Sequence, residues 1–174
     1  MKSNQKNELI PQFRKLLQEQ KIQEIEEERQ KDVRKSNLII YGIKEFEEST
    51  NGDEIFVNDL LIDLESKSKV KFMTRIGDRK KSQSRPLKVV FQSPHEVYLI
   101  TKNLIKLRGN LKYQSISITE DLTWFERQVI KEWANKAEER NAREPNNSNI
   151  FWRVRGSPIS GLYLKKILKK NPLL

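Results

Sequence analysis

Between residues 36 and 120, strand-like and helix-like segments alternate along the chain in an order that few folds accommodate. The strand-like segments are rich in β-branched and aromatic residues or place apolar side chains at every second position. They are 37–43, 70–76, 87–91 and a short segment around Ile116 and Ile118. The helix-like segments have apolar residues at helical spacing, and they are 51–66 and 93–109. The resulting order, β-α-β-β-α-β, predicts a ferredoxin-like domain in which both helices cover one face of the sheet.

The period of the third strand predicts which side chains face the helices. Leu87 and Val89 recur at every second position, so we place them in the core and Lys88 on the open face of the sheet. The same reasoning places Ile39 and Tyr41 of the first strand on the open face. A domain of this plan resembles the RNA-recognition motif, which stacks bases on aromatic rings of its central strands. Here only Tyr41 is placed to stack a base, so we expect weak binding with little base preference.

Residues 1–35 are predicted to form one long helix, because the stretch from Asn7 lacks glycine and is dominated by Glu, Gln, Lys and Arg. Its apolar residues recur at helical spacing without keeping one heptad register throughout. Since an isolated helix this polar is marginal in water, we interpret it as the end of a longer coiled coil. A frayed helix, or one packed on the protein surface, is the alternative. The residues assigned to pairing between chains are Lys21, Ile22, Ile25 and Glu26.

The remaining residues, 121–174, predict a small α/β domain that begins with a helix. Asp121 or Thr123 is expected to cap this helix, which runs to about Arg143. The side chains expected to face a core are those of Phe125, Val129, Ile130, Trp133 and Ala137. The cations expected on its exposed faces are Arg127, Lys131, Lys136 and Arg140.

A strand at 150–155 is predicted to follow, with a turn at 156–158, a short second strand at 159–162 and a basic terminal helix that ends at Lys170. Because side chains alternate along a strand, Arg153 and Arg155 share one face with Phe151, whereas Trp152 shares the other face with Val154.

The charge of the chain is concentrated toward its C-terminus. No aspartate or glutamate follows Glu144, whereas six cations do: Arg153, Arg155, Lys165, Lys166, Lys169 and Lys170. The whole chain has 34 basic and 24 acidic residues, which gives a net charge of +10. Clustered cations bind a polyanion largely by releasing the counterions condensed on it. The sequence therefore predicts a nucleic-acid partner whose phosphate contacts dominate the affinity.

Several classes of protein are disfavoured by what the sequence lacks. There is no cysteine for a zinc knuckle, a disulfide or a thiol nucleophile, and the one histidine is His95 at a helix start. No apolar run approaches the roughly eighteen residues that a membrane span needs. We expect no cofactor, no metal and no enzymatic activity. A metal-dependent nuclease using Glu120 and Asp121 is the weaker alternative, since this pair is better explained as helix capping.

The motifs at 85–91, 118–123 and 131–133 together resemble the first open-reading-frame protein of LINE-type non-LTR retrotransposons. The likeness covers nearly the whole chain. It implies an N-terminal trimeric coiled coil, a non-standard RNA-recognition motif at 36–120 and a C-terminal nucleic-acid-binding domain at 121–174. It also implies a nucleic-acid chaperone that coats the RNA of its own element in a cytoplasmic or nuclear ribonucleoprotein.

The resemblance also implies roles for individual residues. Arg85 matches an RNA-contacting arginine, and Lys131 stands where the family has another, which keeps the charge but loses the bidentate geometry of arginine. Lys21 likewise replaces the arginine of the family's trimer motif. The partner is single-stranded RNA or DNA, and a coiled-coil scaffold whose charge is incidental is the competing interpretation. The residues predicted to contact nucleic acid are Tyr41, Arg79, Lys80, Lys81, Arg85, Lys88, Arg127, Lys131, Trp152, Arg153 and Arg155.

Overall fold

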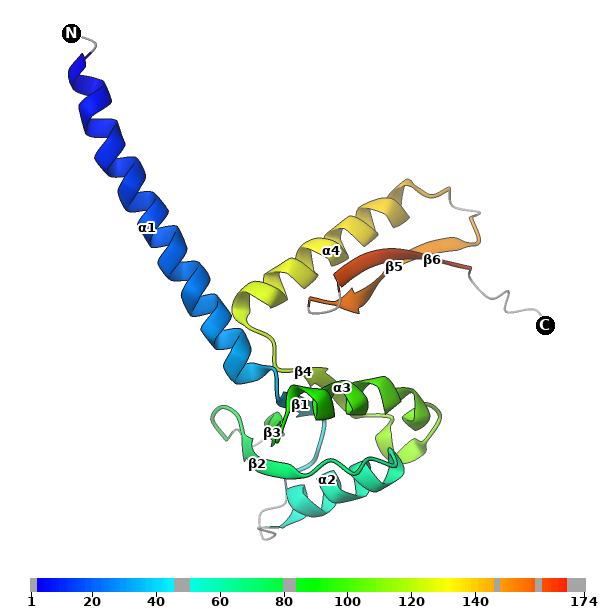
Figure 1. Cartoon of the computed structure of the whole chain (residues 1–174). Coiled ribbons are helices and arrows are strands. Elements are labelled where there is room, and N and C mark those ends of the chain that lie inside the picture. The colour runs from blue at the N-terminus through cyan, green and yellow to red at the C-terminus, as the bar shows by residue number, and fades with distance from the viewer. Residues whose placement is uncertain (1–2, 46–50, 80–83, 146–147, 159–160, 169–174) are drawn as a thin grey trace. The chain divides into compact units, whose positions relative to one another are not determined.

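The computed structural model of the protein describes residues 3–45, 51–79, 84–145, 148–158 and 161–168. The chain divides into two compact units, which we call the N-terminal unit, Met1–Asp121, and the C-terminal unit, Leu122–Leu174. Each unit combines helices with an antiparallel sheet, so the protein is of the mixed α/β class that the sequence predicts (Figure 1). The two units are described separately below.

The N-terminal unit contains a four-stranded antiparallel sheet with the strand order β2-β3-β1-β4. Its strands are β1 (Asn37–Tyr41), β2 (Val70–Arg75), β3 (Leu87–Phe91) and β4 (Ser117–Glu120). The helices between them are α2 (Gly52–Asp63) and α3 (Pro94–Asn103), followed by the 3-10 turns η1 (Leu104–Leu107) and η2 (Leu111–Tyr113). The predicted alternation of strands and helices is thus present, with element ends displaced by a few residues.

The core of this unit lies between the sheet and the two helices. Leu38 and Ile40 of β1 and Leu87 and Val89 of β3 are almost completely buried, as the period-2 pattern of the third strand predicts. The helical side chains in the same cluster are Val57, Leu60 and Leu61 of α2 and Val97 and Ile100 of α3. Ser93 begins α3 with a capping box to Glu96, which confirms the predicted start signal.

Ile39 lies on the face of β1 opposite the helices, as predicted, since the core beneath the helices contains Leu38 and Ile40 but not Ile39. It is nevertheless only 6% accessible, so the expectation that this face leaves it open is wrong. Ile39 lies in a central strand, directly between Lys88 of β3 and Thr119 of β4. Neighbours on both sides cover such a position. Tyr41 is 44% exposed at the end of the same strand, where Ser117 is its small neighbour on β4.

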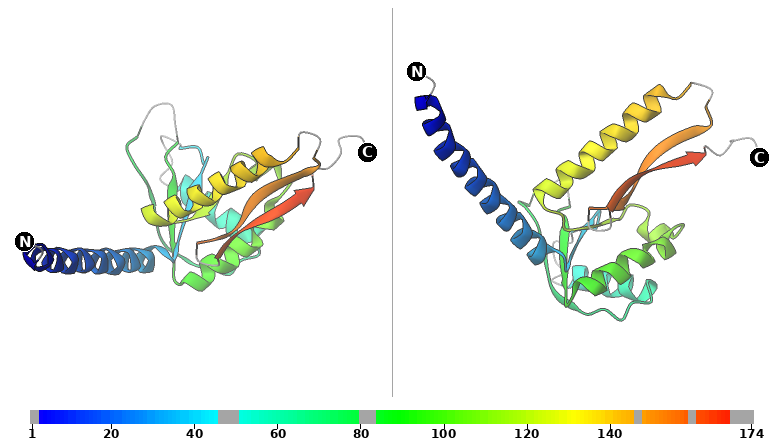
Figure 2. Two further views of the ribbon diagram at one scale, coloured as in Figure 1. Left: turned by 90° about the horizontal axis from the view of Figure 1, so that it is seen from above. Right: turned by 45° about the horizontal axis from the view of Figure 1, so that its top comes forward.

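α1 spans Ser3–Arg34 as one continuous helix, as the two views of Figure 2 also show. The side chains of Ile22 and Ile25 are 65% and 69% exposed. Other apolar side chains that this helix exposes are Ile10, Phe13, Leu16, Leu17 and Val33. No other described part of the N-terminal unit covers these apolar side chains.

Asp121 connects the end of α1 to the sheet through hydrogen bonds and ion pairs. Its carboxylate accepts a hydrogen bond from Arg34 at 3.2 Å and one from the buried amide of Asn37 at 3.0 Å. The ammonium of Lys88 on β3 lies 3.4 Å from the same carboxylate. Asp121 is therefore a structural residue that joins α1, β1 and β3, and it does not cap the following helix.

The C-terminal unit consists of α4 (Trp124–Arg143) and a hairpin of β5 (Ile150–Ser157) with β6 (Gly161–Leu168). Thr123 caps α4, since its hydroxyl accepts a hydrogen bond from the backbone of Glu126 while the Glu126 carboxylate accepts one from the backbone of Thr123. The hairpin lies along α4 in both views of Figure 2. On α4, Ala137 is buried and Ile130 and Trp133 are half-buried, as predicted.

Two predictions for this unit are wrong. The segment predicted as a short strand and a terminal helix forms strand β6 over residues 161–168, and it pairs with β5 along its whole length. The spacing of Leu164, Ile167 and Leu168 imitates a helix, but the alternation that begins at Leu162 prevails. Phe125 is 55% exposed because a side chain in the first turn points back beyond the start of the helix.

Candidate nucleic-acid interface

Arg85, which the sequence assigns to nucleic acid, is held by an acidic residue of its own unit. Its Nε lies 3.1 Å from Oε1 of Glu45, its Nη2 lies 3.2 Å from Oε2, and its backbone N–H donates to the same carboxylate at 2.6 Å. These hydrogen bonds, those of the side chain first, lower the pKa of the Glu45 carboxyl below its ordinary value. The Glu45 side chain is only 15% exposed, so the pair is well shielded from water.

The surrounding cations are engaged in the same way. The side chain of Arg75 is only 8% exposed, pairs with Asp53 and donates to the backbone carbonyls of Ile43 and Arg85. Nε of Arg79 lies 3.9 Å from the Glu45 carboxylate, although more than half of the Arg79 side chain is exposed. Lys80 and Lys81, which are also assigned to nucleic acid, lie outside the described residues.

The candidates on the sheet face differ in availability. Lys88 is largely covered and pairs with Asp121, so its charge is already matched within the N-terminal unit. Tyr41 keeps an exposed ring. On β2 the ring of Phe72, which pairs with Val90 and therefore lies on the same face, is 58% exposed. The structure thus leaves the rings of Tyr41 and Phe72 accessible on this face, whereas Lys88 is engaged by Asp121.

Two candidate cations of α4 are exposed and one turn apart. Arg127 donates to the backbone carbonyl of Leu122 at 2.9 Å, which steadies its side chain without neutralising its charge. Lys131 is exposed four residues later on the same side of the helix. Both cations can therefore reach a phosphate.

Trp152 is anchored against α4. Its indole N–H donates to Glu144 at 2.9 Å, and the guanidinium of Arg140 lies 4.8 Å from the ring centre. Asn141 also forms two hydrogen bonds with the backbone of Trp152. The ring is half-buried and packs as part of the contact between helix and hairpin, on the face of β5 opposite Arg153 and Arg155.

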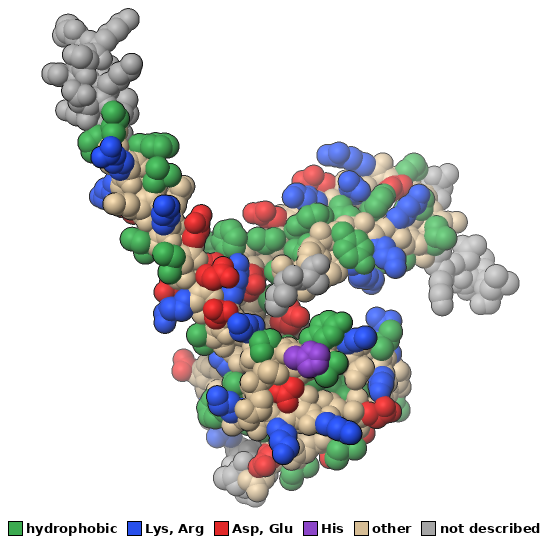
Figure 3. Space-filling model, viewed as in Figure 1, with side chains coloured by type: hydrophobic (Ala, Val, Ile, Leu, Met, Phe, Trp, Pro, Cys, Tyr) green, Lys and Arg blue, Asp and Glu red, His purple; other side chains and the backbone are tan. Residues whose placement is uncertain are grey.

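The other face of the hairpin, which we call the outer hairpin face, carries side chains that oppose one another across the two strands. The facing pairs are Phe151 with Ile167, Arg153 with Lys165, and Arg155 with Tyr163. The three cations of this face are exposed. In the described part of the C-terminal unit no carboxylate forms an ion pair with any of them. Figure 3 shows lysine and arginine side chains interspersed with apolar ones over this unit.

Tyr163 and Lys165 are candidate contact residues that the sequence analysis did not identify. The segment containing them was predicted as a helix, so their position opposite Arg155 and Arg153 could not be anticipated. The signal that could have revealed them is the alternation of Leu162 and Leu164 with Tyr163 and Lys165. In a strand this pattern separates an inner apolar face from an outer polar one.

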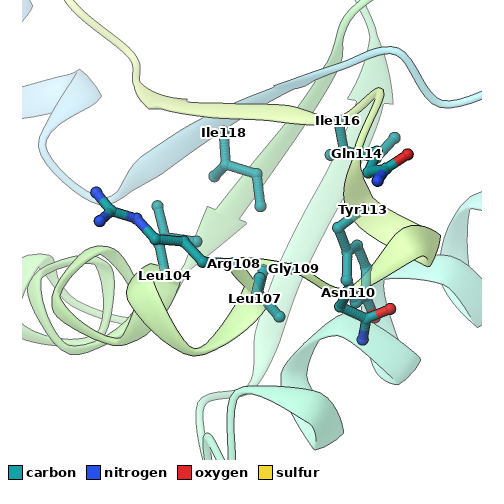
Figure 4. A pocket seen from close by; sticks show the side chains of 9 residues that line it. All are labelled: Leu104, Leu107, Arg108, Gly109, Asn110, Tyr113, Gln114, Ile116 and Ile118. Atoms are coloured by element: carbon teal, nitrogen blue, oxygen red, sulfur yellow. The ribbon is translucent and has the colours of Figure 1, made fainter. Parts of the chain in front are cut away.

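A pocket of about 250 Å³ lies in the N-terminal unit between η1, η2 and β4 (Figure 4). Its walls are mainly apolar, with Leu104, Leu107, Ile116 and Ile118 among the lining residues. The guanidinium of Arg108 points away from Tyr113 in Figure 4. The other polar side chains of its lining are those of Asn110, Tyr113 and Gln114.

Within the described ranges, no three His, Cys, Asp or Glu side chains come together in a way that could hold a metal ion. Neither does any helix of the described chain combine the length and the apolar character that a membrane span requires. No protein-family model matches the sequence, and a search of curated proteins finds no match either.

Proposed function

We propose that this protein binds single-stranded nucleic acid, RNA above all, without acting on it as an enzyme. One observation carries the proposal. Arg153, Arg155 and Lys165 project from one exposed face of a hairpin that contains no acidic residue. Cations without acidic partners keep their full attraction for a polyanion, whereas paired cations such as Arg85 do not.

The physical consequence is an affinity that depends steeply on salt. A cation that neutralises one phosphate of a single strand releases condensed counterions and contributes a slope of about −0.7 to the plot of log affinity against log salt. The three cations of the outer hairpin face, together with Arg127 and Lys131 of α4, make five such cations in the C-terminal unit, so we expect a slope of about −3.5. Contacts of this kind are fast and tolerant of sequence.

At the level of the family, the proposal is that the chain is a LINE-type first open-reading-frame protein that coats its RNA and acts as a chaperone. The strand order β2-β3-β1-β4 supports an RNA-recognition-motif-like assignment for the N-terminal unit. The exposed Ile22 and Ile25 support self-association of α1 into a trimer. A trimer raises the effective concentration of its binding faces along one strand.

The test is the salt dependence of binding by the full chain, measured by fluorescence anisotropy with a labelled oligouridine RNA. The triple variant R153Q/R155Q/K165Q is expected to reduce the slope from about −3.5 to about −1.4, because three phosphate contacts are lost. The control K67Q/K69Q/K71Q removes the same charge from exposed lysines of the N-terminal unit and is expected to keep the slope. A wild-type slope near zero would refute the proposal.

The same assay separates the competing functions. RNA that is cleaved in the presence of magnesium, with cleavage lost in Asp121→Ala, would indicate a nuclease. Purified protein that associates through α1 but binds no RNA at low salt would indicate a scaffold.

A further inference from the structure

We propose that the outer hairpin face is a site for unpaired nucleobases, with Tyr163 as the stacking platform and Arg155, Arg153 and Lys165 as the phosphate-binding groups. This inference rests on the proposed function and adds to it the residues and the form of nucleic acid that they select. Two of its residues, Tyr163 and Lys165, lie on β6, in a segment that the sequence predicts as a helix.

The register of the hairpin brings these groups together. Tyr163 faces Arg155 and Lys165 faces Arg153, so each cross-strand pair has its Cβ atoms about 5 Å apart. Successive pairs on one face are about 6.8 Å apart along the strands, because each residue rises about 3.4 Å. Tyr163 therefore has Arg155 directly opposite, and the pair Arg153–Lys165 lies on the same face about 6.8 Å further along the hairpin. This arrangement can hold a base and the adjoining phosphates at the same time.

Tyr163 is the ring on this face that is available for stacking. It is 54% exposed, and within the described residues no hydrogen bond or ring contact engages it. Phe151 differs, because it is half-buried and the guanidinium of Arg153 lies 5.0 Å from its ring centre. An exposed aromatic ring beside cations gains most from a planar, electron-rich partner such as a nucleobase.

The same geometry explains why the site should prefer single strands. Phosphates are present in both single strands and duplexes, so the cations alone do not distinguish them. A ring projecting from a flat strand face reaches only a base that has left its stack, and duplex RNA keeps its bases stacked inside. Tyr163 therefore supplies the preference, and the cations supply most of the affinity.

Neighbouring lysines of β6 provide a matched test of the site. Lys165 lies on the outer hairpin face, whereas the adjacent Lys166 faces Trp152 on the opposite side, and both are exposed. With the full chain and oligouridine RNA, K165Q is expected to weaken binding several-fold and to make the salt slope less steep by about 0.7. K166Q is expected to leave both quantities as in the wild type.

Tyr163→Ala is expected to weaken oligouridine binding at least about fivefold, which corresponds to the lower end of base stacking on a ring. Its salt slope, and its affinity for an RNA duplex of the same length, should not change. Tyr163→Phe should restore wild-type affinity, since it retains the ring. Thermal unfolding of each variant shows whether the hairpin has remained intact.

A second measurement needs no variant. RNA containing 5-iodouridine is photocrosslinked to the wild-type chain, and the attachment site is mapped by mass spectrometry. A crosslink at Tyr163 supports the proposal, whereas crosslinks only at Tyr41, or at Tyr98, a 58% exposed ring of α3, overturn it. Equal effects of K165Q and K166Q, or an equal loss of single-strand and duplex binding in Tyr163→Ala, also overturn it. In these cases the proposed function survives as long as the wild type binds RNA with the steep slope.

Discussion

Replacing Arg85 with glutamine removes three hydrogen bonds between its guanidinium and the Glu45 carboxylate, and a fourth to the carbonyl of Gly77. The backbone N–H of residue 85 can still donate to Glu45, so the carboxylate is not left without a donor. Charge-assisted hydrogen bonds in a half-buried pair contribute about 1.5–3 kcal/mol. We therefore expect the free energy of unfolding of the N-terminal unit to fall by about 2 kcal/mol, which for a unit of this size lowers Tm by about 4–16 °C.

The dependence of the unfolding free energy on pH provides a second check of this prediction. The folded state lowers the pKa of Glu45, so the stability contributed by this group is fully present above the pKa of the unfolded chain. It is lost as the pH falls through the lowered folded pKa, in the acid range below the ordinary carboxyl value of 4.5. The difference in unfolding free energy between wild type and Arg85→Gln should therefore be constant near neutral pH and shrink in acid.

The same variant tests whether Arg85 contacts nucleic acid. Because its guanidinium is occupied by Glu45, Arg85→Gln should leave the salt slope of RNA binding unchanged, since no phosphate contact is lost. Arg153→Gln is the contrasting control, because it should weaken RNA binding and hardly affect Tm. The reasoning is refuted if Arg85→Gln weakens RNA binding as much as Arg153→Gln while Tm stays at the wild-type value.

Three further outcomes follow from the fold. In Gly156→Ala the C-terminal unit should unfold at a lower temperature than in the wild type. The backbone φ of Gly156 is +85°, and a Cβ would lie 2.0 Å from the carbonyl oxygen of Gly161 on the facing strand. Gly77→Ala has the same φ but open space around it, so calorimetry should show a smaller loss. Thr123→Ala removes the cap of α4 and should cost about 1 kcal/mol in urea unfolding. Ile22→Asp with Ile25→Asp should convert any trimer into monomer in light scattering, because charged side chains cannot occupy a coiled-coil seam.

The elements that the sequence predicts are those with strong local signals. Leu87 and Val89 fix the face of β3 because a single period-2 run allows only one way of burying apolar side chains. Ser93 and Thr123 mark helix starts because their side chains satisfy backbone N–H groups within three residues. Signals of this kind act over a few residues and can be recognised before any tertiary contact is known.

What the sequence does not predict depends on partners far away along the chain. Residues 161–168 form a strand because β5 supplies its hydrogen bonds, although the leucine spacing alone favours a helix. Ile39 is buried because strands β3 and β4, which come later in the chain, flank it on both sides. Phe125 has a core-like spacing but lies in the first turn of its helix, where its side chain points back beyond the helix start. In each case tertiary context overrides a local preference.

Ion pairing between residues far apart in the chain is the property that is hardest to predict from the sequence. It determines which cations remain available to a ligand. Glu45 lies forty residues before Arg85 and Asp121 lies more than thirty residues after Lys88, yet each forms an ion pair with its partner in the folded chain. A count of lysines and arginines treats these residues and Arg155 alike. The hairpin differs because no acidic residue follows Glu144, and its register turns Arg153, Arg155 and Lys165 to one exposed side. Unpaired charge, rather than total charge, therefore directs the search for the binding site to the C-terminal unit.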